Sequence, residues 1–375
     1  MNFFKTLFER RVGLSSSPAN PGEALSGGQL EGAHRGAPLH SDKPFLQKQT
    51  DSYDIISIGD STTDVFLELM EADVVCGEKE KECLLCFDYA GKIPVKKATE
   101  IDAVGNAANN AVGSARLGLN VGIWTMLGKD TNGRQALDLF HAENVLTEFV
   151  EEDQKKGTNY SVVLNYQAER SILVYHNDRD YQFPKLPKAN WVYLTSMGHG
   201  WEKIIANLLD YVELTGAKLA FNPGTHQLNS GLETMKPLLA KSELFILNIE
   251  EAQKILNTKD DVKILLNKLA VLGPKNVVLT DGQNGSYAWQ GGKMWQVPIY
   301  PDLGPVVERT GCGDSYATAT VAALHYGRPL QEALKWGAVN ARMVVQYIGA
   351  REGLQTREQI EKTIQEFKNI QPKTI

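Results

Sequence analysis

Residues 310–314 read TGCGD and stand directly before a run of good helix formers at 315–326. A glycine-rich loop at the start of a helix offers unpaired N–H groups and the positive end of the helix dipole. Glycines also let an anion approach the backbone closely. Beside such a site, the carboxylate of Asp314 could accept the proton of an attacking hydroxyl during phosphoryl transfer. The alternative is that Asp314 only caps the helix, and the segment alone leaves both interpretations open.

Signatures of other enzyme classes are missing or broken. The chain has no G-x-x-x-x-G-K-[ST] segment and therefore no P-loop. The glycines at 311 and 313 begin a G-x-G-x-x-G pattern, but Tyr316 stands at its last position, which breaks the dinucleotide-binding fingerprint. Neither H-E-x-x-H nor G-x-S-x-G occurs.

Three other side-chain types could bind a ligand. Cys83 and Cys86 have the C-x-x-C spacing of a zinc site, with Cys76 nearby. No second pair and no neighbouring histidine completes four ligands, so we expect no zinc and three ordinary small side chains. His199 is the histidine of most interest. Arg170 either contacts substrate or is an ordinary exposed charge.

The elements that position these residues follow a regular rhythm. Short apolar runs predict strands, and segments with apolar residues at helical spacing predict helices between them. The expected strands lie at 55–58, 121–127, 191–194, 218–221, 244–247 and 276–280, and the expected helices at 106–117, 135–143, 201–214 and 265–272. This alternation predicts an α/β fold, a three-layer sandwich with a mostly parallel central sheet.

Two segments, about 73–98 and 158–176, depart from that rhythm and contain short β-prone pieces. Within the second, residues 167–169 form a tight connection that predicts a hairpin. We expect both segments to leave the main sheet and form a small β lid on a folded domain of residues 51–375. Residues 1–50 are rich in Gly, Ser, Pro and Ala without an apolar period, and we expect a disordered leader there.

Composition restricts the class of partner. A formal net charge of -6 argues against a nucleic-acid-binding protein, whose surface is usually basic. No apolar run approaches the roughly 20 residues that span a bilayer, so we expect no membrane partner. Four cysteines in 375 residues do not make a disulfide framework, so we expect a reducing, cytoplasmic setting. Residues 1–11 are too short and too charged for a secretory signal, while an amphipathic targeting peptide stays open.

In the order of its motifs the chain resembles the PfkB carbohydrate kinases, also called the ribokinase family, from about residue 54 to 353. The matching segments are GDSTTD at 59–64, VGNAAN at 104–109, NIEE at 248–251, TDGQNG at 280–285 and GCGD at 311–314. Residues 336–350 resemble the family's helix that closes over adenine. The resemblance implies a ribokinase-like fold, ATP and Mg²⁺ as cofactors, and phosphoryl transfer to a hydroxyl.

The resemblance also implies a role for each matching residue. Asp314 would be the catalytic base, and Asn248 and Glu251 would organise Mg²⁺ through water. The remaining roles are an anion hole of Gly311, Cys312 and Gly313, substrate binding by Asp64, Gly105 and Asn109, and nucleotide binding by Thr280, Gly282, Gly285 and Asn340. Simpler interpretations remain open for four sets of residues. Asp64 could cap a turn, Asn109 could be an ordinary polar residue of a helix, and Glu251 could be a solvated charge. Gly282 and Gly285 could belong to a hairpin turn.

Three departures from the family pattern concern lid motion and cations. Val104 replaces the first glycine of a pair that serves as the lid hinge, and Cys312 stands where alanine is usual. Glu308 and Arg309 occupy the place of Asp-Thr near the family's monovalent-cation site. If Arg309 points inward, held by Glu308, its permanent charge could replace potassium, and we expect weak potassium dependence. If it points to solvent, a cation could still bind.

Together these features predict an ATP-dependent kinase that acts on a sugar or sugar-like hydroxyl. The alternatives are a nucleoside kinase on the same scaffold and, from another class, a non-catalytic ligand-binding relative. By resemblance alone, the β lid is also expected to serve as a homodimer surface.

Overall fold

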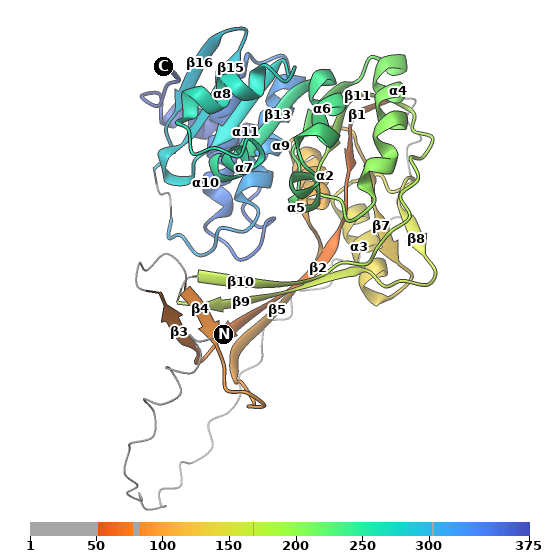
Figure 1. Cartoon of the computed structure of the whole chain (residues 1–375), viewed down its shortest axis with the longest axis vertical. Helices are drawn as coiled ribbons and strands as arrows, with labels where there is room; N and C mark the ends of the chain where they lie inside the picture. Colours follow the sequence, from red (N-terminus) through yellow and green to blue (C-terminus); the bar gives the residue numbers. More distant parts are fainter. Residues whose placement is uncertain (1–51, 78–82, 168, 302–303) are drawn as a thin grey trace, which may run out of the picture. The chain divides into compact units, whose positions relative to one another are not determined.

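The computed structural model describes residues 52–77, 83–167, 169–301 and 304–375, so the expected leader lies outside the described residues. Within them, nine strands form the main sheet in the order β17-β16-β15-β14-β13-β12-β11-β1-β6. From β6 to β14 neighbouring strands are parallel, and β15 to β17 add an antiparallel edge. The mostly parallel α/β sheet is confirmed (Figure 1). The bounds are β1 Ser52–Ile58, β6 Val121–Trp124, β11 Lys188–Leu194, β12 Lys218–Phe221, β13 Ser242–Asn248, β14 Asn276–Thr280, β15 Ser286–Gln290, β16 Lys293–Val297 and β17 Lys373–Thr374.

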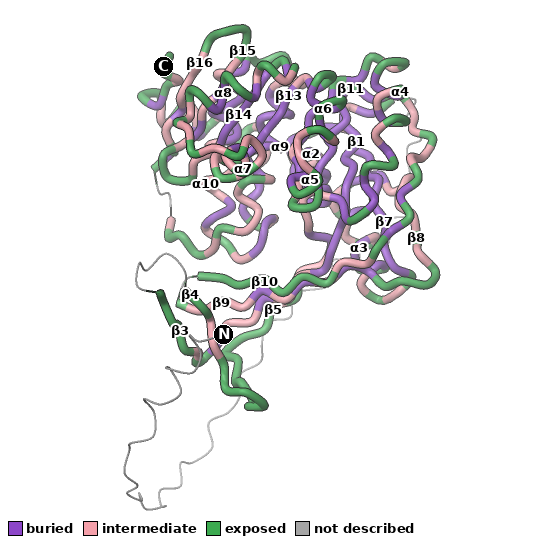
Figure 2. The backbone as a smooth tube through the Cα atoms, in the orientation of Figure 1, coloured by how far each residue is buried: buried purple, intermediate pink, exposed green. Residues whose placement is uncertain are grey.

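Both faces of the main sheet are buried, because its apolar runs supply side chains to two separate cores. Successive side chains of a strand point to opposite faces; Ile55 and Trp191 lie in one core, and Ile56 and Val192 in the other. Figure 2 shows the central strands buried along their length. Among the described residues no helix is long and apolar enough to cross a membrane.

Helices cover each face of the sheet. The first core is covered by α2 Asn106–Arg116, α3 Thr131–Ala142, α9 Cys312–His325, α10 Leu330–Val344 and α11 Arg357–Glu366. The second core is covered by η1 Trp201–Ile204, α4 Ile205–Thr215, α5 Thr225–Ser230, α6 Leu232–Lys241, α7 Ile249–Ile255 and α8 Val262–Ala270.

A second sheet of four strands, in the order β10-β9-β2-β5, forms the lid. Its strands are β2 Thr62–Leu69, β5 Val95–Val104, β9 Asn159–Tyr166 and β10 Glu169–Tyr175. The predicted hairpin is present as the antiparallel pair β9 and β10. The sequence interpretation missed β2, which places Asp64 within the lid sheet rather than in a turn after the first strand. The expected strand at 121–127 is divided at Thr125 into β6 and β7 (Met126–Gly128), and β7 pairs with β8 (Glu151–Asp153) in a separate sheet.

The segment between β2 and β5 folds on itself as a two-stranded sheet, β3 Asp73–Cys76 and β4 Cys83–Cys86. Cys76 and Cys83 are opposite each other on these strands and form a disulfide. The expectation of three ordinary cysteine side chains is therefore wrong for two of them, because antiparallel pairing brings their sulfur atoms together. Cys86 is free and partly buried.

Candidate active site

The glycine-rich segment forms the start of α9. Gly311 is the N-cap residue with a φ of 77°, and it has no side-chain cap. A Cβ atom there would lie 2.2 Å from the Cβ atom of Ala350, so this position needs glycine for both backbone and space. The first N–H groups of a helix have no intrahelical acceptor, so the first turn of α9 offers donors to an anion. The Cys312 amide has a long contact of 3.4 Å to the carbonyl oxygen of Arg309.

Asp314 lies in the first turn of α9 and connects this helix to α2. Its Oδ2 atom accepts a hydrogen bond of 2.7 Å from Nδ2 of Asn109. Asp314 is therefore bound to a neighbouring helix, and Gly311, not Asp314, is the N-cap residue of α9. Burial raises the pKa of the Asp314 carboxyl to about 6, and the hydrogen bond from Asn109 opposes that rise. A carboxylate of this pKa can be ionised near neutral pH and still accept a proton.

Asp64 and Asn109 each keep an oxygen atom without a donor. Asp64 Oδ1 and Asn109 Oδ1 are buried and have no hydrogen-bond partner among the described residues. Burial raises the pKa of Asp64 to about 6, a hydrogen bond from Ser161 lowers it, and the charge of Glu308 raises it further. Buried polar atoms are normally paired, so these two acceptors could be satisfied by a ligand that brings O–H or N–H donors.

Gly105 joins the lid strand β5 to α2. Its φ is 97°, and a Cβ atom there would lie 2.9 Å from the carbonyl oxygen of Asp60. Glycine therefore lets the chain turn from the lid into α2 while touching the loop that precedes β2. Val104 stands where the first glycine of the family's pair would be, and its side chain is buried in the protein.

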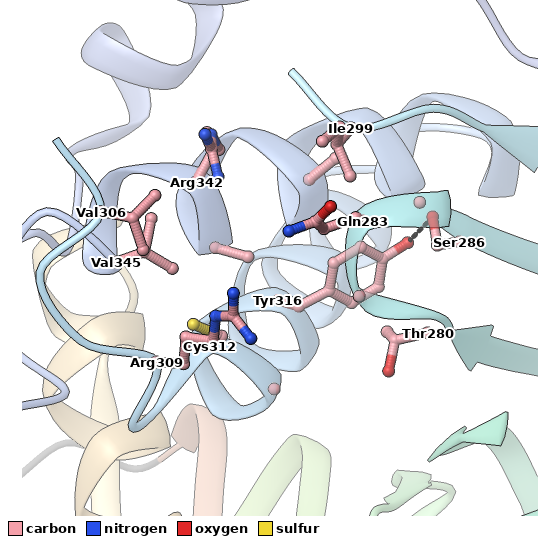
Figure 3. Close-up of a pocket in the computed structure, with 15 residues that line it drawn as sticks. Thr280, Gln283, Ser286, Ile299, Val306, Arg309, Cys312, Tyr316, Arg342 and Val345 are labelled. Atoms are coloured by element: carbon pink, nitrogen blue, oxygen red, sulfur yellow. Dashed lines mark hydrogen bonds between the residues drawn. The ribbon is translucent and has the colours of Figure 1, made fainter. Parts of the chain in front are cut away.

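A cavity of about 370 Å³ lies beside the start of α9 (Figure 3). Thr280, the last residue of β14, lines it on one side together with Gly282 and Gly285, which follow that strand. Apolar side chains, among them Ile299 and Val345, line much of the rest of it, together with Arg309 and Arg342. Apolar walls with a few polar groups suit a flat heteroaromatic base, so Thr280, Gly282 and Gly285 lie where ATP could fit.

A second cavity, of about 200 Å³, adjoins the first. Thr280 and Gly313 line both cavities, so the start of α9 forms part of their common wall. Asp314, Asn248 and Glu251 line only the second one. A phosphate chain that extends from a nucleotide in the larger cavity would therefore meet Gly313 before it meets Asp314.

Asn248 and Glu251 form a reciprocal cap at the start of α7. Asn248 Oδ1 accepts from the Glu251 amide at 2.8 Å, and Glu251 Oε2 accepts from the Asn248 amide at 2.9 Å. Burial raises the pKa of Glu251, and the negative charge of Asp314 adds to this. Two carboxylates beside one cavity suit a hard cation such as Mg²⁺. Among the described residues, no three His, Cys, Asp or Glu side chains are placed so that they could hold a metal ion together.

Asn340 does not line either cavity, in contrast to the sequence prediction. Its side chain donates to the Ser315 carbonyl at 2.9 Å and accepts from the Gln355 amide at 3.0 Å, and it is fully buried. Both ends of the amide are used to join α10 to α9 and to the segment before α11. On α10 it is Ala338, Ala341 and Arg342 that line the nucleotide cavity, because they lie on its other face.

Glu308 and Arg309 diverge at the entrance to the glycine segment. Arg309 lines the larger cavity, where Figure 3 shows it beside Cys312. Glu308 instead accepts a hydrogen bond from the Thr310 amide at 2.8 Å and forms an ion pair with Arg170 of the lid at 3.4 Å. The expectation that Glu308 holds Arg309 is therefore wrong, and Arg170 is not an isolated exposed charge.

Several residues of the second cavity were not predicted. Ser196, Asn222 and Thr225 line it together with Asp314. Asn222 directly follows β12, and Ser196 follows β11 by two residues. Since ligands of parallel α/β sheets bind at the carboxyl ends of strands, polar residues just after these predicted strands were an available signal.

Comparison of the sequence with known proteins gives a consistent group of relatives. A family described as pfkB family carbohydrate kinase matches residues 74–357. The 5-dehydro-2-deoxygluconokinase of Bacillus subtilis is 26% identical over 291 residues, which cover 70% of this chain and 86% of the relative. The ribokinase of the same organism is 24% identical over 273 residues, or 69% and 87% of the two chains.

Solved structures with the same fold belong to the same group. Ribokinase of Arabidopsis thaliana, complexed with ribose and ATP, superposes with a TM-score of 0.67 at 21% identity, covering 83% of this chain and 98% of that one. A nucleoside kinase of Methanocaldococcus jannaschii, from the ribokinase family, has a TM-score of 0.68 at 17% identity, covering 84% and 99%. These likenesses concern the fold.

Proposed function

The chain belongs to the pfkB family of carbohydrate kinases, and it is therefore an ATP-dependent phosphotransferase with an alcohol group as acceptor. Within that activity, we propose that Asp314 is the base that accepts the proton of a sugar hydroxyl. The observation that carries this proposal is the place of Asp314. It lines the cavity that adjoins the nucleotide cavity, and it is bonded to Asn109, whose other amide atom faces no donor among the described residues.

The sugar would be held from the lid and from α2 together. Asp64 Oδ1 and Asn109 Oδ1 are acceptors that sugar hydroxyl groups can satisfy. Asn109 also bonds Asp314, so a hydroxyl bound at Asn109 would lie close to the base. This arrangement would orient the hydroxyl toward the phosphate before transfer, which is where much of the catalysis of phosphoryl transfer originates.

The transferred phosphoryl group would meet the first turn of α9. There the backbone N–H groups of Gly311, Cys312 and Gly313 would offset the charge that develops on it. Burial, followed by the charge of Glu308, raises the pKa of the Cys312 thiol to about 12, so this thiol stays protonated and adds no negative charge to the site.

Asn248 and Glu251 would hold Mg²⁺ through water molecules, beside the phosphates of ATP in the second cavity. When bound, the ion supplies positive charge that shields the phosphate oxygens from the incoming hydroxyl. The protein itself holds Glu251 in place, because the reciprocal cap with Asn248 leaves that carboxylate little rotational freedom.

We also propose that activity depends only weakly on potassium, because Arg170 supplies a permanent positive charge beside Glu308.

The acceptor can be identified by ADP release measured across a panel of sugars and nucleosides at fixed ATP-Mg²⁺. We expect release that depends on an added sugar. Release with nucleosides alone would mean that the substrate is a nucleoside and not a sugar, and ligand binding without release would indicate a non-catalytic relative.

Asp64→Ala serves as the matched variant. Its kcat/KM for the phosphorylated substrate should fall about tenfold to a hundredfold with ATP binding unchanged, because a charged hydrogen-bond acceptor is lost.

The exposed lid supports a homodimer, which we propose as the assembled form. Every residue of β10 is exposed, including Ile172, Leu173, Val174 and Tyr175. An apolar edge strand open to solvent is a ready site for pairing with another chain, and a second copy offers the same surface.

The cytoplasm, which supplies ATP, is the proposed location of the reaction.

A further inference from the structure

Arg170 is a lid residue that forms an ion pair with Glu308, next to the glycine-rich segment. It stands near the start of β10, a strand that is exposed throughout. Its Nη1 atom lies 3.4 Å from Glu308 Oε1, and the Glu308 side chain is only 8% exposed while that of Arg170 is 36% exposed. A surface arginine thus pairs with a carboxylate that has little access to water, which is the situation in which loss of one partner is costly.

Arg170 and Asp64 lie on the same face of the lid sheet. Arg170 is opposite Asn165 on β9, and Asn165 is opposite Glu68 on β2. Residues directly opposite on neighbouring strands point to one side, and so do residues separated by an even number along a strand. Asp64 precedes Glu68 by four residues, so the proposed sugar ligand and Arg170 share the face that is turned to the active site.

Glu308 connects this arginine to the anion-binding loop. Its Oε1 atom accepts from the amide of Thr310 at 2.8 Å and from the Thr310 hydroxyl, and its Oε2 atom lies 3.4 Å from the amide of Gly349. Gly349 precedes Ala350, the residue packed against Gly311. One carboxylate therefore joins the lid, the start of the anion-binding loop and the segment that packs on it.

We propose that Arg170 is a positioning residue for phosphoryl transfer: it neutralises Glu308 and holds the loop before Gly311 in its working arrangement only while the lid covers the site. This inference rests on the proposed function. The lid sheet carries both Asp64 and Arg170, so a sugar held by Asp64 also keeps Arg170 against Glu308. Binding of the acceptor would thereby add to the contact between Arg170 and Glu308 that this structure already has.

The charges near the loop agree with this arrangement. The negative charge of Glu308 raises the pKa of both Asp64 and Cys312, whereas the positive charge of Arg170 lowers that of Cys312. At the position of Cys312 the two charges thus act in opposite directions. If the lid withdrew Arg170, Glu308 would lose its ion-pair partner. Of the two arginine charges that lower the pKa of Cys312, only that of Arg309 would then remain. The carboxylate of Glu308 would then repel the phosphoryl oxygens more strongly.

A charge-rescue experiment tests the proposal through activity. The acceptor is whichever compound of the sugar and nucleoside panel gives the fastest ADP release. With Arg170→Gln we expect kcat to fall about tenfold with KM for ATP within about twofold, because a poorly hydrated charge is left unpaired. Adding Glu308→Gln, which keeps an acceptor for Thr310 but removes the charge, should return kcat to within about threefold of the wild type. A double variant as slow as Arg170→Gln would overturn the proposal.

Lys96→Gln provides the matched control, because Lys96 is also a lid cation paired with a glutamate, at 2.7 Å from Glu68, but both side chains are well exposed. It should leave kcat unchanged, as exposed ion pairs contribute little. Arg170→Lys keeps the charge and should lose less than Arg170→Gln. A loss in Lys96→Gln equal to that in Arg170→Gln would mean that any lid charge matters, and it would reject a specific role for Arg170.

Hydrogen exchange tests the same proposal without any acceptor. In the full-length protein with ATP-Mg²⁺, amides of residues 307–311 and 346–350 should exchange faster in Arg170→Gln than in the wild type or Lys96→Gln. Unchanged exchange in Arg170→Gln would overturn the inference whatever the activity. If no sugar or nucleoside is phosphorylated, the proposed function fails, and the exchange experiment alone decides on Arg170.

Discussion

Asp314 combines a single strong hydrogen bond, from Asn109, with a carboxyl group that has little access to water. Burial makes its carboxylate more basic, and Asn109 holds one oxygen in place, so the other is left for a substrate proton. The same two conditions would be of no use in a residue that only caps a helix, since a cap must accept from its own backbone amides.

Replacing Asp314 by Asn should nearly abolish turnover. The amide has the same shape but is not a useful base, and losing general-base assistance typically costs about 10²–10⁴ in rate. Binding of ATP, measured by calorimetry, should persist, because the nucleotide residues are untouched. A folded Asp314→Asn protein with a near-normal kcat would contradict the assignment.

The acid limb of the pH profile should report two carboxyl groups. Burial raises the pKa of both Asp314 and Asp64 to about 6, and both must be ionised, one as a base and one as a ligand. We therefore expect kcat/KM for the acceptor to be constant above that pH and to fall below it, with a slope steeper than one proton gives. In Asp64→Asn the slope should drop to one; a profile that is flat down to pH 5 would reject both roles.

At the scale of elements, the start of α9 depends on two glycines for different reasons. Gly311 has a positive φ and no room for a Cβ atom, whereas a Cβ atom at Gly313 would meet no protein atom within 4 Å. Gly313 nevertheless lines both cavities, so its empty side is the space that the phosphates of ATP would use.

Alanine at these two positions should therefore separate stability from activity. Gly311→Ala should lower the melting temperature, since a strained backbone and an overpacked contact cost about 1–3 kcal/mol each. Gly313→Ala should keep or raise the melting temperature, as alanine favours a helix by about 1 kcal/mol over glycine. It should still reduce kcat, because the methyl group enters the phosphate path. Full activity in Gly313→Ala would mean that phosphate does not pass there.

For the whole molecule, the lid sheet carries the acceptor ligand on one face and apolar surface elsewhere. Val174 is opposite Ser161, which is opposite Asp64, so Val174 shares the face of the site. Leu173 and Tyr175 lie on the other face, because side chains alternate along a strand. That second face is available to another copy of the chain without obstructing the sugar.

A double variant, Leu173→Lys with Tyr175→Lys, should convert a dimer to monomers. Burying two lysines in an interface is unfavourable, and both positions are exposed in the single chain, so folding should be unaffected. Sedimentation over a range of protein concentrations measures the change. A wild-type protein that sediments as a monomer at every concentration would contradict the proposed assembly.

The sequence alone was sufficient for most of the alternation of strands and helices and for the motifs at the ends of β13 and β14 and at the starts of α2 and α9. Apolar runs must be buried, and glycines beside a carboxylate before a helix restrict the local chemistry, so these features are encoded in short segments. The glycine segment, the NIEE segment and the TDGQNG segment could all be found because each depends on neighbours in the chain.

Only the tertiary structure decided which side chains meet. Asp64 proved to be part of a lid strand, because pairing with β9 and β5 overrides the local turn signals around it. Asn340 was turned away from the nucleotide cavity by partners 15 and 25 residues distant. Cys76 met Cys83 across a strand pair, and Glu308 met Arg170 instead of its neighbour Arg309. Each of these depends on contacts between separate elements, which local sequence does not encode.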